Sequence, residues 1–387
     1  MFRKLLLPAL LLLCLLVTAC DLPQVSAEER LFLDLSLDFL GAYELPKDSF
    51  QETRVGGLSA IAYDRQRDRV YALSDDRSNY APARFYTLKL NLETANPETV
   101  RLGTVEIENV TVLKDRDGQT YSSGSLDPEG LALSPRQSVF VASEGVANQD
   151  VSPFIDEFDL ETGRWKGRLP VPDRYIPTTI DEKRRGVQDN LGFEALTLNP
   201  GGFSSNWLEP FRLFAATESS LVQDAPATPT PDAPIRSRFL HYLIGDEKPT
   251  LLAEHLYLVE PPSEGAIANG LTELQTLDQA GHFLSLERSY GLNGGGARIY
   301  QLATGGATDI SGMSSLPDDT TGIIPIRKQI VLDLATLNIP LDNLEGMTLG
   351  PRLPDGTQSL LMISDDNFSD TQVTQVLLFR LKGWTAQ

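Results

Sequence analysis

Acidic residues recur at matching places along this sequence, and they are the side chains best suited to chemistry. Glu129, Glu194 and Glu345 lie in similar segments that read Asp-Pro-Glu-Gly-Leu, Gly-Phe-Glu-Ala-Leu and Asn-Leu-Glu-Gly-Met. Two further segments of this kind carry Ser59 and Thr272 at the same place, so the five positions follow one another at intervals of 65 to 78 residues. A repeat of this length predicts several copies of one structural unit.

A second acidic position follows each of these segments. A turn leads into another apolar run that ends in Asp or Glu, as in residues 139–143 before Glu144. Carboxylates without Cys or clustered His favour Ca²⁺ or Mg²⁺ over zinc or copper. We therefore predict a metal site for Ca²⁺ or Mg²⁺. Its candidate ligands are Asp75, Asp76, Glu129, Glu144, Glu194, Glu218, Glu287, Glu345, Asp365 and Asp366.

Arginine residues accompany this acidic pattern. Arg77, Arg84 and Arg288 lie close in sequence to predicted metal ligands, and guanidinium groups bind phosphate oxygens through paired hydrogen bonds. These three are the candidate substrate-binding residues. The same arginines, together with Arg298, could instead pair with the acids and hold neighbouring units together, which would make the ring of charges purely structural. No motif singles out a catalytic residue.

The repeats also predict the elements that position these side chains. Each copy has two apolar runs joined by a turn, and two more strand candidates usually follow, as in residues 84–90 and 100–107. Four strands per repeat indicate an all-β fold, a β-propeller. We count five four-stranded blades, or six if one repeat has diverged beyond recognition. The last repeat has only three strand candidates, so we expect residues 32–43 to supply the fourth and close the ring, which removes open sheet edges.

Propeller geometry predicts that the acids converge. The first strand of each blade lines the central channel, and the second strand runs antiparallel to it, so the start of one lies beside the end of the other. Glu129 should then neighbour Glu144, Glu194 should neighbour Glu218, and Glu345 should neighbour the acids that end its own hairpin. All of them should meet at one mouth of the channel. Carboxylates this close must be protonated, paired with arginine or bound to a cation.

The first twenty residues have the composition of a targeting signal. Arg3 and Lys4 precede an apolar run over residues 5–17, which is too short for an ordinary membrane span and typical of a signal peptide. The run ends in Val-Thr-Ala-Cys, which resembles a bacterial lipobox. We expect a signal peptide over residues 1–19, lipidated Cys20 with a linker over residues 20–30, and a propeller over residues 31–387. The product would be an exported lipoprotein that faces the periplasm and contacts the membrane only through its lipid.

Composition argues against several classes of function. The formal net charge is −20, whereas nucleic-acid binding needs clustered Lys and Arg. The only cysteines are Cys14 and Cys20, so the mature chain would have no thiol nucleophile, disulfide or thiolate metal site. We expect a monomer without a second membrane span.

Several motifs occur together in a fixed order. They are Leu-Ser-Asp-Asp-Arg at 73–77, Asp-Pro-Glu-Gly at 127–130, Asn-Gly-Leu-Thr-Glu at 269–273, Leu-Glu-Arg-Ser at 286–289 and Asn-Leu-Glu-Gly-Met at 343–347. As a set they resemble the phytase-like family, which is named for an esterase-like activity of phytase, over about residues 50–382. The resemblance implies a phosphoester or ester hydrolase with a small phosphorylated or ester substrate, and calcium by analogy with β-propeller phytases. It carries over no catalytic residue.

Three functions remain open at this point. The first is a calcium-dependent phosphoester or ester hydrolase at the acidic mouth, with Arg77 and Arg288 holding the phosphate. The second is a non-catalytic binding or scaffold propeller of the cell envelope, which lipid anchoring would suit. The third is an enzyme that acts on a sugar or a lactone. Acids fully paired with arginine would favour the second function.

Overall fold

The computed structural model describes residues 31–96, 99–199, 209–228, 230, 233–262, 265–291 and 294–384. The predicted signal peptide and Cys20 lie outside them. Residues 34–387 form one unit, and its described helical elements are the short 3₁₀ turns η1 (Ala147–Gln149), η2 (Asp173–Tyr175), η4 (Val222–Asp224) and η5 (Leu334–Leu337). Within the described residues, no helix is long and apolar enough to cross a membrane.

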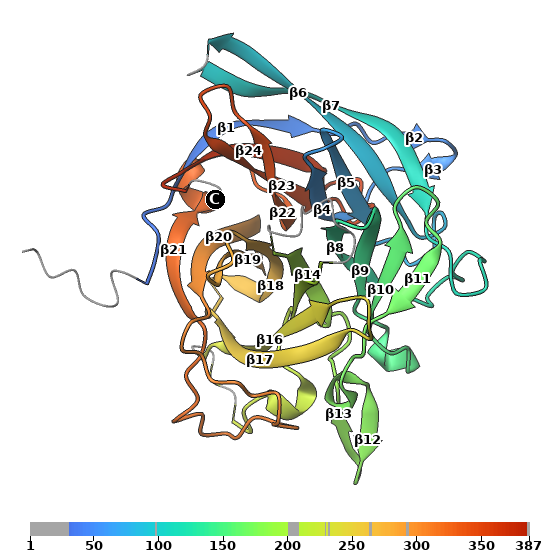
Figure 1. Cartoon of the computed structure of the whole chain (residues 1–387), viewed down its shortest axis with the longest axis vertical. Helices are drawn as coiled ribbons and strands as arrows, with labels where there is room; N and C mark the ends of the chain where they lie inside the picture. The colour runs from blue at the N-terminus through green and yellow to red at the C-terminus, as the bar shows by residue number, and fades with distance from the viewer. Residues whose placement is uncertain are drawn as a thin grey trace, which may run out of the picture. The chain divides into compact units, whose positions relative to one another are not determined.

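Five four-stranded antiparallel sheets are arranged in a ring, so the prediction of an all-β propeller with five blades is confirmed (Figure 1). The first four sheets follow one another along the chain. They are blade 1, with β4 (Leu58–Asp64), β5 (Arg69–Ser74), β6 (Arg84–Asn96) and β7 (Thr99–Val112); blade 2, with β8 (Pro128–Ser134), β9 (Ser138–Ser143), β10 (Phe154–Asp159) and β11 (Trp165–Arg168); blade 3, with β14 (Phe193–Leu198), β15 (Phe211–Thr217), β16 (Ile235–Ile244) and β17 (Thr250–Val259); and blade 4, with β18 (Ala266–Thr276), β19 (His282–Gly291), β20 (Gly294–Ala303) and β21 (Arg327–Asp333).

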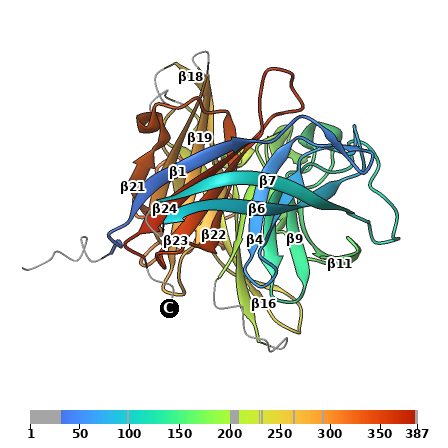
Figure 2. The same cartoon turned by 90° about the horizontal axis from the view of Figure 1, so that it is seen from above.

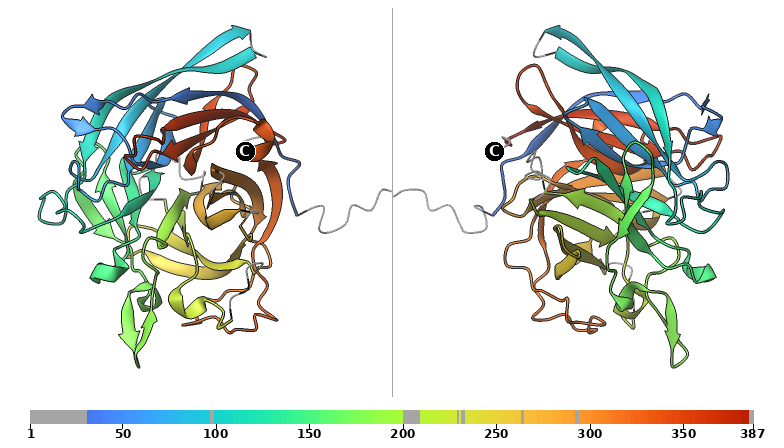
Figure 3. Two further views of the ribbon diagram at one scale, coloured as in Figure 1. Left: turned by 180° about the vertical axis from the view of Figure 1, so that it is seen from behind. Right: turned by 45° about the vertical axis from the view of Figure 1, so that its right-hand side comes forward.

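The two ends of the propeller meet in blade 5. It contains β22 (Asn343–Arg352), β23 (Gln358–Asp365), β24 (Gln375–Lys382) and the N-terminal strand β1 (Ser36–Glu44). β1 pairs antiparallel with β24 from Ser36 opposite Lys382 to Glu44 opposite Gln375 (Figure 2). The predicted closure by an N-terminal strand is therefore confirmed. Two small hairpins lie outside the blades, β2–β3 (Ser49–Phe50, Thr53–Arg54) and β12–β13 (Thr178–Ile180, Lys183–Arg185), and the second projects away from the ring (Figures 1 and 3).

The hydrophobic core lies between adjacent blades. Ala60 and Leu73 of blade 1, for example, share one buried cluster with Leu131 and Val141 of blade 2, and similar clusters join blades 2 and 3, 3 and 4, and 5 and 1. Inner strands are covered on both faces, so they read as continuous apolar runs: β9 is buried along its whole length. Each fully buried Leu or Val contributes roughly 1.5–3 kcal/mol, and this packing fixes the inner strands around the ring.

Candidate metal centre

Every innermost strand carries a β-bulge at the repeat position. The register of each inner hairpin shifts by one residue, between Pro128 and Gly130 in blade 2 for example, and the unpaired residue is the repeat position found in the sequence. The bulged residues in chain order are Ser59, Glu129, Glu194, Thr272 and Glu345. A bulge redirects a side chain and is frequent next to functional sites. Three of the five blades use it to place a glutamate.

The second strands supply the matching positions. In each blade we compare the residue of the second strand that lies opposite the residue two positions before the bulge. In chain order these residues are Asp75, Glu144, Glu218, Arg288 and Asp365. Blade 4 thus places a guanidinium where the other four blades place a carboxylate. The sequence repeats predict Glu287 at this position of blade 4, which is one residue too early. A shift of one residue turns a side chain to the other face of a strand, so Glu287 faces away and accepts hydrogen bonds from the Tyr257 hydroxyl (2.5 Å) and the Lys328 ammonium (2.5 Å).

Among the residues that the structure describes, two groups of three carboxylates could each hold a metal ion. Asp127, Glu129 and Glu144 offer oxygens that all lie within 4.8 Å of one another, and so do Glu144, Glu194 and Glu218. Glu144 belongs to both groups. Calcium binds oxygen at about 2.3–2.6 Å, so two ligands of one ion lie at most roughly twice that distance apart, and these oxygens are within that limit. The predicted proximity of Glu129 to Glu144, and of Glu194 to Glu218, is confirmed.

Arg288 links these groups to the remaining acids. Its guanidinium donates to Glu218 (3.1 Å) and pairs with Glu345 (3.3 Å). Glu345 lies close enough to Asp365, and Asp365 to Asp75, to raise the neighbour's pKa. Arg77 forms a two-pronged ion pair with Asp127, with one contact of 2.7 Å. We call the whole set the mouth cluster: Asp75, Asp127, Glu129, Glu144, Glu194, Glu218, Glu345, Asp365, Arg77 and Arg288.

The mouth cluster resists full ionisation. Eight carboxyl groups share two guanidinium groups, and burial raises the pKa of all eight, well above the ordinary range for Glu129, Glu144 and Glu194. Burial raises the pKa of Glu218 to about 7, although Arg288 pulls it down. Desolvation disfavours the charged form, and neighbouring acids add to it. A divalent cation would remove this penalty.

Two fully buried carboxylate oxygens of the cluster have no hydrogen-bond partner. They are Oε2 of Glu194 and Oδ1 of Asp75, and Nε of Arg288 is likewise unpartnered. Glu194 is only 6% exposed, and a buried polar atom without a partner costs about 1–3 kcal/mol or more when charged. The residues present therefore fit a hard divalent cation: the donors are oxygens, they converge, and two of them lack any other partner.

Comparison with known proteins agrees with this architecture. A model of the phytase-like family, described as esterase-like activity of phytase, matches residues 53–368. This chain belongs to the phytase-like family. The match spans all of the mouth cluster, from Asp75 to Asp365. No curated protein matches the sequence.

The phytase-like chain also has distant structural neighbours. The catalytic domain of the Coprinopsis cinerea GH62 alpha-L-arabinofuranosidase is 10% identical, with a TM-score of 0.40, and the match covers 92% of this chain and 99% of that one. The Neurospora crassa Pan2 WD40 domain is 9% identical, with a TM-score of 0.35 and coverage of 89% and 95%.

Glycines make room for two of the acids of this phytase-like propeller. A Cβ on Gly270 would collide with the carboxylate of Glu218, and one on Gly192 would collide with the backbone of Glu144. The N–H of Gly192 also donates to the Glu144 carboxylate at 2.5 Å. Each glycine belongs to the blade that follows its acid, so close approach of backbone and carboxylate joins neighbouring blades at the mouth.

Besides Glu287, three predicted site residues lie in structural networks instead of the cluster. Arg84 and Asp76 form a fully buried ion pair of 2.7 Å, and Arg84 also donates to the Tyr86 hydroxyl. Asp366 accepts the N–H of Gly57 at 2.8 Å, which ties blade 5 to blade 1. The local partners of these residues explain their burial without a ligand.

One cluster residue was missed by the sequence reasoning. Asp127 occupies the place two residues before the bulge, where blades 1, 3 and 4 carry glycine and blade 5 carries Asn343. The Asn343 amide donates to Glu345 at 2.8 Å. Counting back from each repeat position to the first polar residue would have identified both.

Proposed function

We propose that this phytase-like propeller is a calcium-dependent hydrolase of phosphoesters or esters, with the mouth cluster as its site. The observation that carries the proposal is the excess of carboxyl groups over guanidinium groups, together with the unpartnered buried oxygen of Glu194. A purely structural ring would be expected to balance its charges and to satisfy its buried atoms.

The residues of the cluster would have different roles in metal binding and anion binding. Asp127, Glu129 and Glu144, or Glu144, Glu194 and Glu218, would hold calcium, which polarises an ester oxygen and lowers the pKa of bound water. Arg77 is 31% exposed on its side chain, so it can hold Asp127 and still face an incoming anion.

Where calcium is held by the group that contains Glu129, Glu218 stays free of the metal and is suited to proton transfer. Its pKa of about 7 lies near neutral pH, where a general base or acid is most effective. Arg288 contacts this carboxylate directly, so a substrate anion drawn to Arg288 would lie beside a group that can accept or return a proton.

Hydrolysis of p-nitrophenyl phosphate and p-nitrophenyl acetate tests the proposal. We expect activity on at least one of them with calcium, loss of that activity with a chelator, and a roughly 100-fold lower kcat in Glu129→Gln. Glu108→Gln is the control, because Glu108 makes an exposed ion pair with Arg69 outside the cluster. Activity that survives both the chelator and Glu129→Gln would refute the proposed function.

A second candidate is a non-catalytic binding or scaffold propeller of the cell envelope. The ion pairs of Arg77 with Asp127 and of Arg288 with Glu218 favour it, because they already neutralise part of the mouth. Calcium binding without turnover of either ester would select this candidate.

The cellular location is part of the proposal. An exported lipoprotein acylated on Cys20 would present the propeller in the periplasm. Mass spectrometry of the N-terminal peptide should show a diacylglyceryl group on Cys20, and Cys20→Ala should move the protein from the membrane fraction to the soluble fraction. An unmodified Cys20 at the end of an uncleaved leader would contradict it.

A further inference from the structure

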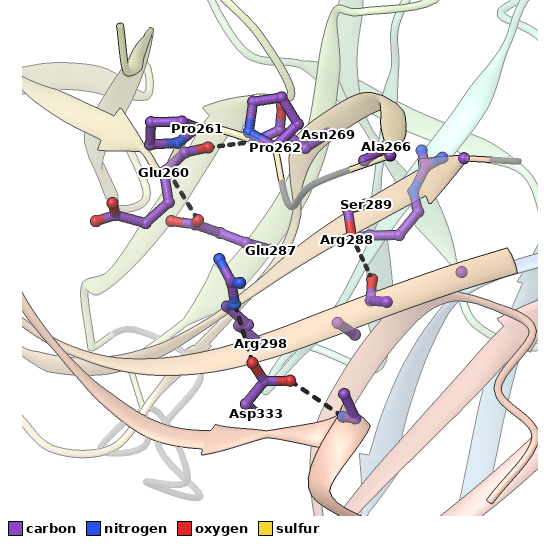
Figure 4. A pocket seen from close by; sticks show the side chains of 16 residues that line it. Glu260, Pro261, Pro262, Ala266, Asn269, Glu287, Arg288, Ser289, Arg298 and Asp333 are labelled. Atoms are coloured by element: carbon purple, nitrogen blue, oxygen red, sulfur yellow. Dashed lines mark hydrogen bonds and ion pairs between the residues drawn. The ribbon is translucent and has the colours of Figure 1, made fainter. Parts of the chain in front are cut away.

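A pocket of about 360 Å³ lies on blade 4 beside the mouth cluster (Figure 4). Its walls are the start of β18, the end of β19, the start of β20 and the segment 260–262 that follows β17. The volume falls within the lower part of the range of small-molecule sites, roughly 300–1,000 Å³. Arg288 lines this pocket and also contacts Glu218 and Glu345, so the pocket and the mouth cluster share one side chain.

The charged groups around the pocket are already paired with one another. Arg298 donates to Asp333 at 3.2 Å, as Figure 4 shows. Lys328 pairs with both Glu260 (3.1 Å) and Glu287 (2.5 Å). Arg288 lines the pocket as well, and its side chain stays 17% exposed although it pairs with Glu218 and Glu345. A ligand can therefore place one anionic group near Arg288, whereas a second anionic group would meet the exposed carboxylate of Glu260.

The rest of the lining suits an uncharged, hydroxyl-bearing group. Most of these residues are glycine, alanine or proline: Gly265, Gly291, Gly295, Gly296, Ala266, Ala297, Ala335, Pro261 and Pro262. Such small residues leave room for a ring and keep backbone groups accessible. Asn269, Ser289 and Glu260 add amide, hydroxyl and carboxylate groups that can bond to hydroxyls.

We propose that this pocket binds the uncharged, hydroxylated alcohol part of a monoester substrate while the reacting group lies at Arg288. The inference rests on the proposed function and narrows its substrate class. The pocket would accept substrates with a single anionic group and disfavour polyphosphorylated ones. Ala266 and Ala297 are then specificity-determining positions, because larger side chains there would occupy the space of the alcohol.

Binding measurements test this inference without requiring turnover. Glucose 1-phosphate and glucose 1,6-bisphosphate serve as probes, with dissociation constants from saturation-transfer NMR of the purified protein in calcium. Ala266→Trp fills the pocket from a half-exposed position at the start of β18. Ala268→Trp is the matched control, because Ala268 is exposed on the same strand and does not line the pocket.

We expect glucose 1-phosphate to bind and the bisphosphate to bind roughly tenfold more weakly. Ala266→Trp should lower the affinity for the monophosphate roughly tenfold, about 1.4 kcal/mol. Ala268→Trp should bind like the parent protein, and calcium titration should be the same in both variants. The inference fails if the monophosphate does not bind, if Ala266→Trp binds it normally, or if the bisphosphate binds more tightly. Retained pocket binding without any ester turnover would instead count against the proposed function alone.

Discussion

Two clusters of charged residues in this propeller are built from the same types of side chain, carboxylates and guanidinium groups, but in different proportions. The mouth cluster gathers eight carboxyl groups around Arg77 and Arg288. The blade 3 network, which we define as Arg174, Asp224, Arg238 and Glu254, has two acids and two arginines. Both are largely buried, yet only the first leaves carboxylate oxygens without partners.

The blade 3 network is closed. Arg238 donates to Asp224 (2.6 Å) and to Glu254 (2.9 Å), and Arg174 donates to Glu254 from the other side. Asp224 also accepts the N–H of Leu316 at 2.7 Å. The side chains of Arg238, Asp224 and Glu254 are 0% exposed. Every charge has an opposite charge in contact, as a structural role requires.

The difference between the clusters indicates which one awaits a ligand. A balanced network gains nothing from an added cation and has no oxygen free to bind it. The mouth cluster carries excess carboxyl groups with raised pKa values and shares an arginine with a pocket. Substitutions and changes of pH should therefore affect the two clusters differently.

The largest effect is expected in the blade 3 network. Arg238→Met removes the shared cation and leaves Asp224 and Glu254 buried without it, so we expect a loss of about 3–5 kcal/mol in the free energy of unfolding. Urea denaturation followed by fluorescence measures it, and calcium binding by the remaining folded protein should be unchanged. A loss below about 1 kcal/mol would show that the network is not the structural element described.

Glu194→Gln should have the opposite profile. It removes one carboxylate from a crowded set, so we expect the calcium-free protein to be as stable as the parent or more stable. The increase in melting temperature caused by calcium should become smaller, because binding weakens by at least about tenfold. Thermal unfolding with and without calcium measures both quantities. A calcium-free variant that is several kcal/mol less stable would assign Glu194 a structural role.

The pH dependence of stability separates the clusters further. The pKa of Glu218 is about 7 in the fold against 4.5 for an unperturbed Glu, so the folded state holds more protons than the unfolded state between these values. The stability of the calcium-free protein should therefore decrease as pH rises from about 4.5 to 7. Saturating calcium should make this decrease in stability smaller. Melting curves across this range test it. Glu218→Gln should flatten the slope, and an unchanged slope would contradict the assignment.

The smallest effect is expected at an exposed pair. Arg69 and Glu108 are 27% and 35% exposed on their side chains, so Arg69→Ala should change the free energy of unfolding by less than about 1 kcal/mol. The same urea assay measures it. A loss comparable to that of Arg238→Met would mean that burial does not govern the strength of these ion pairs.

The repeats predicted much of this structure because they reflect its geometry. Ser59, Glu129, Glu194, Thr272 and Glu345 are conspicuous in the sequence because each occupies a bulge that every blade needs. The same pattern predicted the blade count and the convergence of acids. Closure by β1 followed from the missing strand of the last repeat.

The errors have equally physical causes. Glu287 matches the acids of the other repeats in charge, whereas strand pairing puts Arg288 at the cluster position. An offset of one residue along a strand turns the side chain to the other face of the sheet. The blade 3 network was not predicted because Asp224, Arg238 and Glu254 lie outside the repeated segments and meet only through tertiary packing. The pocket on blade 4 depends on glycines that no pattern of periodicity marks.

The most direct test of the central claim is a calcium titration by calorimetry, with Glu194→Gln and Glu108→Gln compared with the parent protein. We predict that the parent and Glu108→Gln bind calcium alike, with release of protons from the carboxyl groups, and that Glu194→Gln binds it at least about tenfold more weakly. Absence of binding at millimolar calcium, or equal binding by all three proteins, would contradict the claim that the mouth cluster is a metal site.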